Sequence, residues 1–197
     1  MFTGIIETMG KIKAIETSGS NRIFEIQSLI SNELKVDQSV AHDGVCLTVT
    51  SVGEGVHHVT AVEETLNKSS LGHLKPGKSI NLERCMPADG RFDGHIVQGH
   101  VDTRGKVTRR ESRDGSWLFT FQFPQGFSSQ VVEKGSVTIN GISLTCFNVG
   151  RQEFSVTIIP YTFDHTTMSQ LEVGDEVNLE FDIIGKYVQR MLATSRL

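Results

Sequence analysis

The chain has 197 residues, a hydrophobic content of 38% and a formal net charge of −4. This acidic balance provides no basic field that would attract nucleic acid or anionic lipid. The three cysteines, Cys46, Cys85 and Cys146, have no paired spacing, which indicates a reducing compartment rather than a disulfide scaffold. No stretch reaches transmembrane length and the first residues lack a signal-peptide pattern, so we expect a soluble cytoplasmic protein.

The second half of the chain repeats the first. Three separate blocks recur at one offset of 97 residues (140 − 43 = 97), namely 43–48 as 140–145, 64–71 as 161–168, and 77–83 as 174–180. A period of this length is too long for a solenoid unit, so a whole domain has been duplicated. We therefore expect two similar domains, residues 1–88 and 95–183, with two similar pockets.

Short β-rich runs bounded by Gly, Asn or Ser dominate both halves. Strands are expected at residues 23–26, 39–42, 45–52, 56–62, 79–82, 117–123, 137–139, 144–149, 153–159 and 176–181. Asp43-Gly44 and Asn140-Gly141 are typical hairpin turns, because both residue types tolerate positive φ. Such closely spaced strands predict small closed barrels, since closure removes sheet edges.

Helical segments are expected between the strands and after them. Short helices or helical turns are predicted at residues 28–34, 63–74, 127–134 and 161–171, with Asn67 or Asp164 near a cap. Residues 85–94 form the connector. Residues 184–197 have no counterpart in the first half, and their apolar side chains fall on one helical stripe: Ile184, Tyr187, Val188, Met191 and Leu192. That helix packs either on its own barrel or, as we favour, on another subunit.

The two halves differ at a few positions where chemistry could reside. Cys46 corresponds to Ser143, His100 to Ile5, and Lys134 to Asp37. A histidine that replaces an apolar residue indicates specialisation, since histidine titrates near neutrality. The alternative interpretations are that Cys46 is a small core residue and Lys134 a solvated surface residue.

Two other histidines have plainer interpretations. His42 is interpreted as a hydrogen-bonded turn histidine. His95 and His100 are five residues apart, which places them on opposite faces of a strand. Because no cysteine or carboxylate set accompanies them, we expect no metal site.

Four ordered motifs resemble the riboflavin synthases of the alpha-chain type. They are Met-Phe-Thr-Gly-Ile-Ile at residues 1–6, Ser-Val-Ala-His-Asp-Gly-Val-Cys-Leu-Thr at 39–48, Gly-His-Ile-Val-Gln-Gly-His-Val-Asp at 94–102, and Asn-Gly-Ile-Ser-Leu-Thr at 140–145. The resemblance covers nearly the whole chain. One departure is Asp43, where the family usually has Asn, and both residues suit that turn.

The resemblance implies an all-β fold of two tandem six-stranded Greek-key β-barrels with a C-terminal α-helix, assembled as a homotrimer. It implies dismutation of two 6,7-dimethyl-8-ribityllumazine molecules, by transfer of a four-carbon unit, to riboflavin and 5-amino-6-ribitylaminopyrimidinedione. No cofactor is implied, and lumazine synthase is a candidate supplier of the substrate. The site would lie between the N-barrel of one subunit and the C-barrel of the next.

The resemblance also assigns substrate-binding positions. In the N-barrel they are Gly4, Ile5, Ile6, Cys46, Leu47, Thr48, Thr60, Ala61, Val62, Glu63, Glu64 and Thr65. In the C-barrel they are Gly99, His100, Val101, Ser143, Leu144, Thr145, Thr157, Ile158, Ile159, Pro160, Tyr161 and Thr162, with Lys134 reaching in from the neighbouring subunit. Ser39, Cys46 and His100 are candidates for proton transfer and nucleophile positioning, with their individual roles left open.

Two other functions stay open at this stage. One is a non-catalytic lumazine- or flavin-binding antenna protein, which would share the fold but would have lost Ser39, Cys46, His100 and Lys134. The other is a tandem β-barrel interaction or nucleic-acid module. The acidic charge and the scarcity of Trp and Tyr, with one and two residues, argue against base-stacking platforms.

Overall fold

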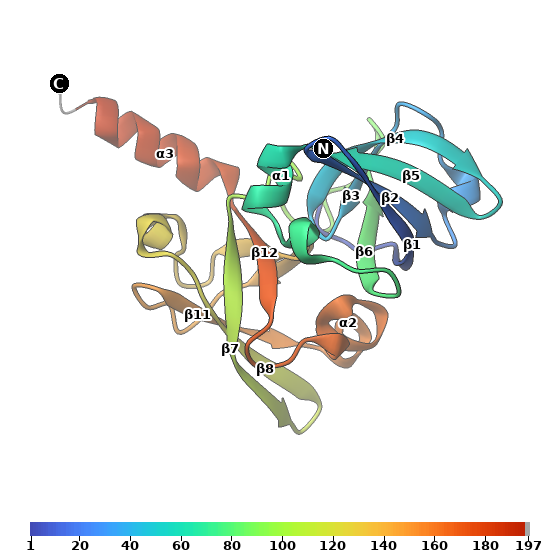
Figure 1. Cartoon of the computed structure of the whole chain (residues 1–197). Helices are drawn as coiled ribbons and strands as arrows, with labels where there is room; N and C mark the ends of the chain where they lie inside the picture. The colour runs from blue at the N-terminus through green and yellow to red at the C-terminus, as the bar shows by residue number, and fades with distance from the viewer. Residues whose placement is uncertain (196–197) are drawn as a thin grey trace.

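The computed structural model describes residues 1–195 as two β-barrels followed by a projecting helix (Figure 1). The first barrel is closed, in the order β1-β2-β5-β4-β3-β6. Its strands are β1 (Thr8–Ser18), β2 (Asn21–Gln27), β3 (Ser39–His42), β4 (Val45–Gly53), β5 (Val56–Ala61) and β6 (Ser79–Arg84). Helix α1 (Glu63–Lys68) and 3₁₀ turns at Ser31–Glu33 and Ser70–His73 connect them.

The second barrel repeats this order, with one difference at its seam. Its sheet runs β10-β9-β12-β7-β8-β11. The strands are β7 (Thr103–Arg113), β8 (Ser116–Gln122), β9 (Ser136–Ile139), β10 (Ile142–Thr145), β11 (Glu153–Ile158) and β12 (Glu176–Phe181). Helix α2 (Pro160–His165) and 3₁₀ turns at Gln125–Gln130 and Thr167–Gln170 complete it. β10 stops at Thr145, so the seam to β11 is bridged only by Phe147 with Ser155.

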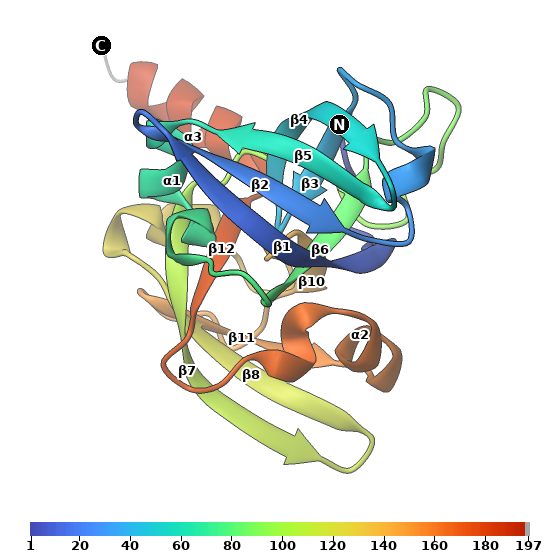
Figure 2. The same cartoon turned by 45° about the vertical axis from the view of Figure 1, so that its right-hand side comes forward.

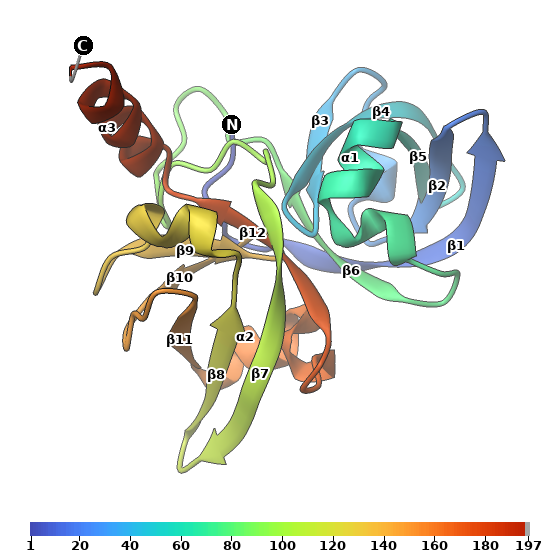
Figure 3. The ribbon, with the colours of Figure 1, turned by 60° about the vertical axis from the view of Figure 1, so that its left-hand side comes forward.

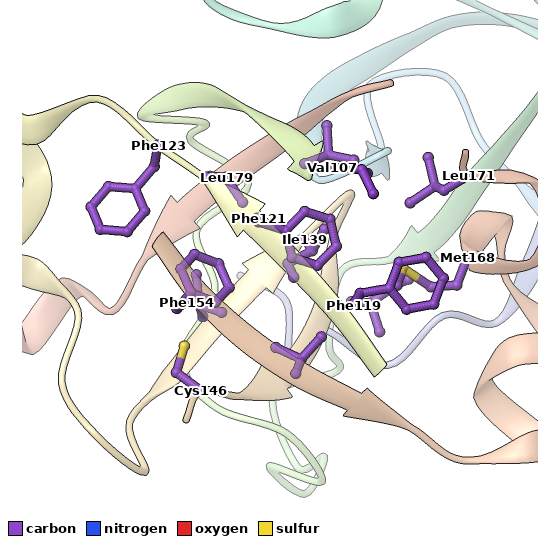
Figure 4. Close-up of a cluster of buried hydrophobic side chains, with 14 of the residues drawn as sticks. Val107, Phe119, Phe121, Phe123, Ile139, Cys146, Phe154, Met168, Leu171 and Leu179 are labelled. Carbon is purple, nitrogen blue, oxygen red and sulfur yellow. The ribbon is translucent and has the colours of Figure 1, made fainter. Parts of the chain in front are cut away.

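Each barrel has its own apolar core. Figure 4 shows the second, in which the rings of Phe119, Phe121 and Phe154 lie together at centroid distances of 6.1 and 5.8 Å. A small third cluster of Phe2, Ala41 and Val97 lies where the barrels meet. The predicted pair of six-stranded β-barrels is therefore confirmed.

Several predicted elements need correction. Strands β1 and β7, each of 11 residues, were missed because a register shift, between Ile12 and Ala14 and between Val107 and Arg109, breaks the alternation of buried and exposed side chains. The strand expected at residues 144–149 ends at Thr145. Asn67 and Asp164 lie inside their helices and cap nothing; the side chains of Ser69 and Thr166 accept from the N–H groups of Leu71 and Met168 instead.

The core of the first barrel holds a polar chain that the second lacks. His42 Nδ1 lies 3.0 Å from the Val40 carbonyl, which can only accept, so His42 Nε2 must accept from His57 Nε2 at 3.0 Å. His57 Nδ1 in turn accepts from the Ser31 hydroxyl at 2.8 Å. Both rings are fully buried, and burial lowers the pKa of His42 to about 3 and that of His57 to about 4. The matching positions of the second barrel are Ile139 and Phe154, so this pair is a feature of one half only.

The barrels are joined by N-terminal arms that cross. Each arm contacts both barrels, which lie side by side in Figures 2 and 3. Ile6 packs against the second core and Val101 against the first. Phe2 and Val97 exchange backbone hydrogen bonds of 2.8 and 3.1 Å where the arms meet. Residues 4–6 were predicted to bind substrate in the N-barrel and residues 99–101 in the C-barrel, and in the structure both segments reach the opposite barrel.

The duplicated turns meet each other at the centre of this junction. A Cβ on Gly44 would lie 2.7 Å from the Gly141 nitrogen, and φ is +79° and +80° at the two residues, so both must be glycine. The carboxamides of two asparagines cross between barrels: Asn81 donates to the Asn140 carbonyl at 3.0 Å, and Asn178 to the Asp43 carbonyl at 2.9 Å. The repeated sequence blocks therefore build a pseudo-twofold interface.

Helix α3 (Ile183–Thr194) projects away from both barrels (Figures 1 and 3). Its root is fixed by Lys186, which pairs with Asp102 at 2.7 Å, and by Asp182, which caps the Ile184 N–H at 2.9 Å. The five apolar side chains of the predicted stripe are each 50–67% exposed. The helix begins at Ile183, one residue before the predicted range of 184–197. Residues 196–197 lie outside the described part of the chain.

Candidate functional site

The first pocket lies at the junction and draws on both halves of the chain. Its volume is about 270 Å³. The lining residues come from β4, from α1 and the turn after it, and from the crossing arm: Val45, Cys46, Glu64, Thr65, Lys68, Ser69, Gly99, His100 and Val101. Cys46 donates its N–H to the Gly99 carbonyl at 2.8 Å, which holds the arm against the strand.

The second pocket is the counterpart in the other barrel and is larger, at about 600 Å³. It is lined by Arg113, Lys134, Ser143, Leu144, Thr145, Phe147, Thr157, Ile159 and Thr162. The short β10 leaves the seam with β11 mostly unpaired, and Thr145, Phe147 and Thr157 line the pocket there. Ser143 donates its N–H to the Gly4 carbonyl at 2.8 Å, the mirror of the Cys46 contact.

Two buried carboxylates hold the crossing arms in place. Glu83 accepts from the N–H and hydroxyl of Thr3 at 2.7 and 3.0 Å, and from the Gly4 N–H at 3.1 Å. Glu180 accepts from the N–H groups of residues 98, 99 and 100 at 2.7, 2.9 and 3.0 Å. Burial raises the pKa of both carboxyls, and these hydrogen bonds oppose the rise. Both glutamates recur in the repeat, which is the signal that could have marked them.

The structure gathers about half of the predicted binding residues into the two pockets. From the prediction, Cys46, Glu64, Thr65, Gly99, His100 and Val101 line the first, and Lys134, Ser143, Leu144, Thr145, Thr157, Ile159 and Thr162 the second. Five lining residues were missed: Val45, Lys68, Ser69, Arg113 and Phe147. Val45, Lys68 and Ser69 had a sequence signal, because they lie in the repeated blocks 43–48 and 64–71, whereas Arg113 and Phe147 had none.

The other predicted residues lie around these pockets without lining them. Ala61 and Ile158 are fully buried and Leu47 nearly so, because the alternation of their strands turns them into the cores. Ile5 borders a separate cavity beside Glu83 and Arg84. The remaining predicted residues line neither pocket: Gly4, Ile6, Thr48, Thr60, Val62, Glu63, Pro160 and Tyr161.

Two of the three candidate catalytic residues, Cys46 and His100, line the first pocket. Ser39 does not line it but hydrogen-bonds the Cys46 side chain. Burial raises the pKa of the Cys46 thiol, and the hydrogen bond from Ser39 only partly offsets this. Cys46 is therefore a neutral thiol near pH 7, suited to hydrogen bonding and proton transfer rather than to attack as a thiolate.

The described residues contain neither a cluster of metal-binding side chains nor a helix that could span a membrane. Within residues 1–195, no three or more His, Cys, Asp or Glu side chains are grouped as a metal site would need. His95 and His100, which the sequence placed on opposite faces, serve different barrels. His95 contacts Ser143, and His100 lines the pocket that holds Cys46. No helix in the same part of the chain is long and apolar enough to cross a membrane.

Comparison with known proteins places this architecture in one family. The family model of the lumazine binding domain matches residues 3–85 and 98–182, one match for each half. The riboflavin synthase of Actinobacillus pleuropneumoniae is 40% identical over 193 residues, which cover 98% of this chain and 90% of that protein. The riboflavin synthase of Bacillus subtilis (strain 168) is 38% identical with the same coverage.

Solved structures share the fold. LumP complexed with riboflavin superposes with a TM-score of 0.86 at 20% identity, covering 92% of this chain and 100% of LumP. LumP complexed with 6,7-dimethyl-8-(1'-D-ribityl) lumazine gives a TM-score of 0.84 at 19% identity, covering 92% and 99%. Together with the relatives that match along almost the full length, these findings show that the chain belongs to the riboflavin synthase family.

Proposed function

We propose that this protein makes riboflavin from two molecules of 6,7-dimethyl-8-ribityllumazine. One molecule donates a four-carbon unit to the other, and 5-amino-6-ribitylaminopyrimidinedione is the second product. The observation that carries the proposal is the presence of two unlike pockets at equivalent places in a duplicated chain, since the reaction needs two copies of one compound in different roles. The relatives named above, at 38–40% identity, support the same reaction.

The rate would come mostly from placing two heterocycles with their reacting carbons in contact. Holding such a pair in a productive orientation lowers the barrier by roughly 7–11 kcal/mol. The backbone donors of the two pockets would stabilise charge on a substrate that loses a ring-methyl proton. Ser39, Cys46 and His100 would move that proton and position the nucleophile, and no cofactor or metal would take part.

The two reacting molecules would be brought together by subunit contact. We propose a homotrimer in which the first pocket of one subunit faces the second pocket of the next, with Lys134 reaching across. The apolar stripe of α3 supports this, because five side chains that are 50–67% exposed on a lone helix need a partner surface. The three free cysteines fit a reducing cytoplasm, where a lumazine synthase would supply the substrate.

One assay tests the reaction. Purified protein is incubated with the lumazine in EDTA, and riboflavin fluorescence is followed together with substrate consumption. We expect two lumazines consumed per riboflavin formed. A requirement for metal or nucleotide would overturn the cofactor-free reaction.

A lumazine- or flavin-binding antenna is the second candidate, favoured only by the shared fold with LumP. Such a protein would be purified with a fluorescent chromophore and would form no riboflavin, so its absorbance and the assay above separate the two functions.

A further inference from the structure

A histidine outside the predicted site contacts the second pocket. His95 Nδ1 lies 2.7 Å from Ser143 Oγ, and Ser143 lines that pocket. In the sequence, His95 was weighed only as a metal ligand. In the structure its ring contacts the hydroxyl of Ser143, a residue that lines the second pocket.

The backbone around His95 is held rigidly. Its N–H donates to the Thr3 carbonyl at 3.0 Å, and two residues later Val97 pairs with Phe2. The preceding Gly94 leaves no room for a side chain, because a Cβ there would lie 1.9 Å from the Thr3 carbonyl oxygen. The imidazole is therefore presented to Ser143 from a segment of backbone that these contacts hold in place.

The charge state of the ring decides what it can offer. Burial lowers the pKa of His95, and the nearby Asp182 opposes this to a smaller extent. The ring is thus neutral near pH 7 and carries one N–H and one lone pair. If Nδ1 holds the lone pair, it accepts the proton of the Ser143 hydroxyl, and the serine oxygen keeps only lone pairs for a ligand.

We propose that His95 orients the Ser143 hydroxyl as an acceptor, so that the second pocket selects ligands that present an N–H at that point. In the lumazine and flavin ring systems the imide N–H of the pyrimidinedione is such a group. This inference rests on the proposed function, because it assumes that the pocket holds one of these rings. It makes His95 a positioning residue that acts through Ser143.

The first pocket lacks this arrangement. Its equivalent of Ser143 is Cys46, whose side chain is hydrogen-bonded by Ser39, and a thiol is a weak hydrogen-bonding group. A methyl group on the imide nitrogen should therefore be rejected in one pocket and tolerated in the other. In a binding titration, the discrimination by Ser143 against a methylated imide nitrogen should therefore appear in one of the two binding steps.

The experiment compares riboflavin with 3-methylriboflavin by calorimetric titration of the full-length protein. In the wild type, one of the two binding steps should disfavour the methylated flavin. His95→Phe keeps a ring but removes both nitrogens, and Ser143→Ala removes the hydroxyl. Each should lower the preference of that step for riboflavin about fivefold, as expected for one lost hydrogen bond. The double variant should lose no more than either single variant.

Two further variants separate positioning from a general structural role. His95→Asn places an amide oxygen near the position of Nδ1 and should restore most of the preference. His58→Phe, on the outer face of β5, is the matched control and should leave the preference unchanged. In lumazine turnover, His95→Phe should raise KM about fivefold with little change in kcat, because the contact is made equally in the ground and transition states.

The outcomes separate the two proposals. If the wild type binds riboflavin but His95→Phe and Ser143→Ala keep the full preference, the role of His95 is overturned and the proposed function stands. Equal weakening of both flavins in His95→Phe, without rescue by asparagine, also overturns it, since that result indicates a packing role. If the wild type binds neither riboflavin nor lumazine, the proposed function itself fails.

Discussion

A carboxyl group buried between the barrels should limit stability near neutral pH. Asp43 is 5% exposed, and burial raises its pKa from 3.8 to about 7, although its carboxylate accepts a hydrogen bond of 2.8 Å from the Asn81 N–H. Between pH 4 and 7 the folded state therefore binds more protons than the unfolded state at this site. The contribution of Asp43 to stability must then fall as the pH rises through that range.

The size of the effect follows from the two pKa values. A rise from 3.8 to about 7, at about 1.4 kcal/mol per pH unit, corresponds to about 4 kcal/mol as an upper bound. Asp43→Asn removes this cost. The second barrel shows that asparagine fits, because Asn140 occupies the equivalent turn, with φ of +47° against +45°, and accepts from the Asn178 N–H at 2.8 Å.

Thermal unfolding at pH 4 and pH 8 measures the prediction. We expect Asp43→Asn to match the wild type at pH 4 and to melt higher at pH 8, by about 4–15 °C for roughly 2–4 kcal/mol in a chain of this size. The reciprocal variant Asn140→Asp should lose stability at pH 8 and recover it at pH 4. A difference from the wild type that is the same at both pH values would refute the reasoning, because it could not arise from ionisation.

Three further expectations concern the acid limit, the assembly and the chemistry. His42 and His57 have folded pKa values of about 3 and 4, so the contribution of this pair to stability should fall as the pH falls from about 6.5 to 4. In urea titrations at these two pH values, His42→Ile with His57→Phe should become more stable relative to the wild type as the pH falls. Deleting the residues after Gly185 should dissociate subunits and abolish most riboflavin formation; an intact, active trimer in light scattering would contradict the assembly. Cys46→Ser and His100→Ile should lower kcat more than they weaken riboflavin binding. If both variants turn over at the wild-type rate, the difference between these residues and their counterparts Ser143 and Ile5 concerns packing only.

The repeated blocks predicted the fold because they coincide with its tightest constraints. Gly44 and Gly141 meet backbone to backbone, and the two asparagines of β6 and β12 cross between barrels, so these positions tolerate little change. Strands β1 and β7 were not predictable in the same way. A register shift inside each strand interrupts the alternation of buried and exposed side chains, so no continuous period-2 pattern distinguishes them from loops.

The sequence predicted many of the residues that line the two pockets, but not how the two halves of the chain share them. Periodicity reveals which face of a strand is buried, and it places Cys46 and Ser143 correctly on equivalent strands. It carries no information on which barrel an arm will contact, so the sequence did not predict that residues 99–101 line the pocket of the first barrel or that Ile6 packs on the second core. His95 was missed as a pocket residue for the same reason, since its partner Ser143 is 48 residues away in the chain.

The crossing arms also set an order of events during synthesis on the ribosome. All six strands of the first barrel have been made once Arg84 has emerged, so that barrel can close early. Its pocket has no arm until residues 99–101 follow, and the arm at residues 1–6, although Glu83 can already bind Thr3 and Gly4, lacks its contact with Ser143 until β10 exists. A nascent chain therefore passes through a stage with a folded barrel and an open pocket. The arm at residues 99–101 of a longer nascent chain has the sequence that this pocket takes, so synthesis on neighbouring ribosomes gives exchange between chains an opportunity to compete with completion within one.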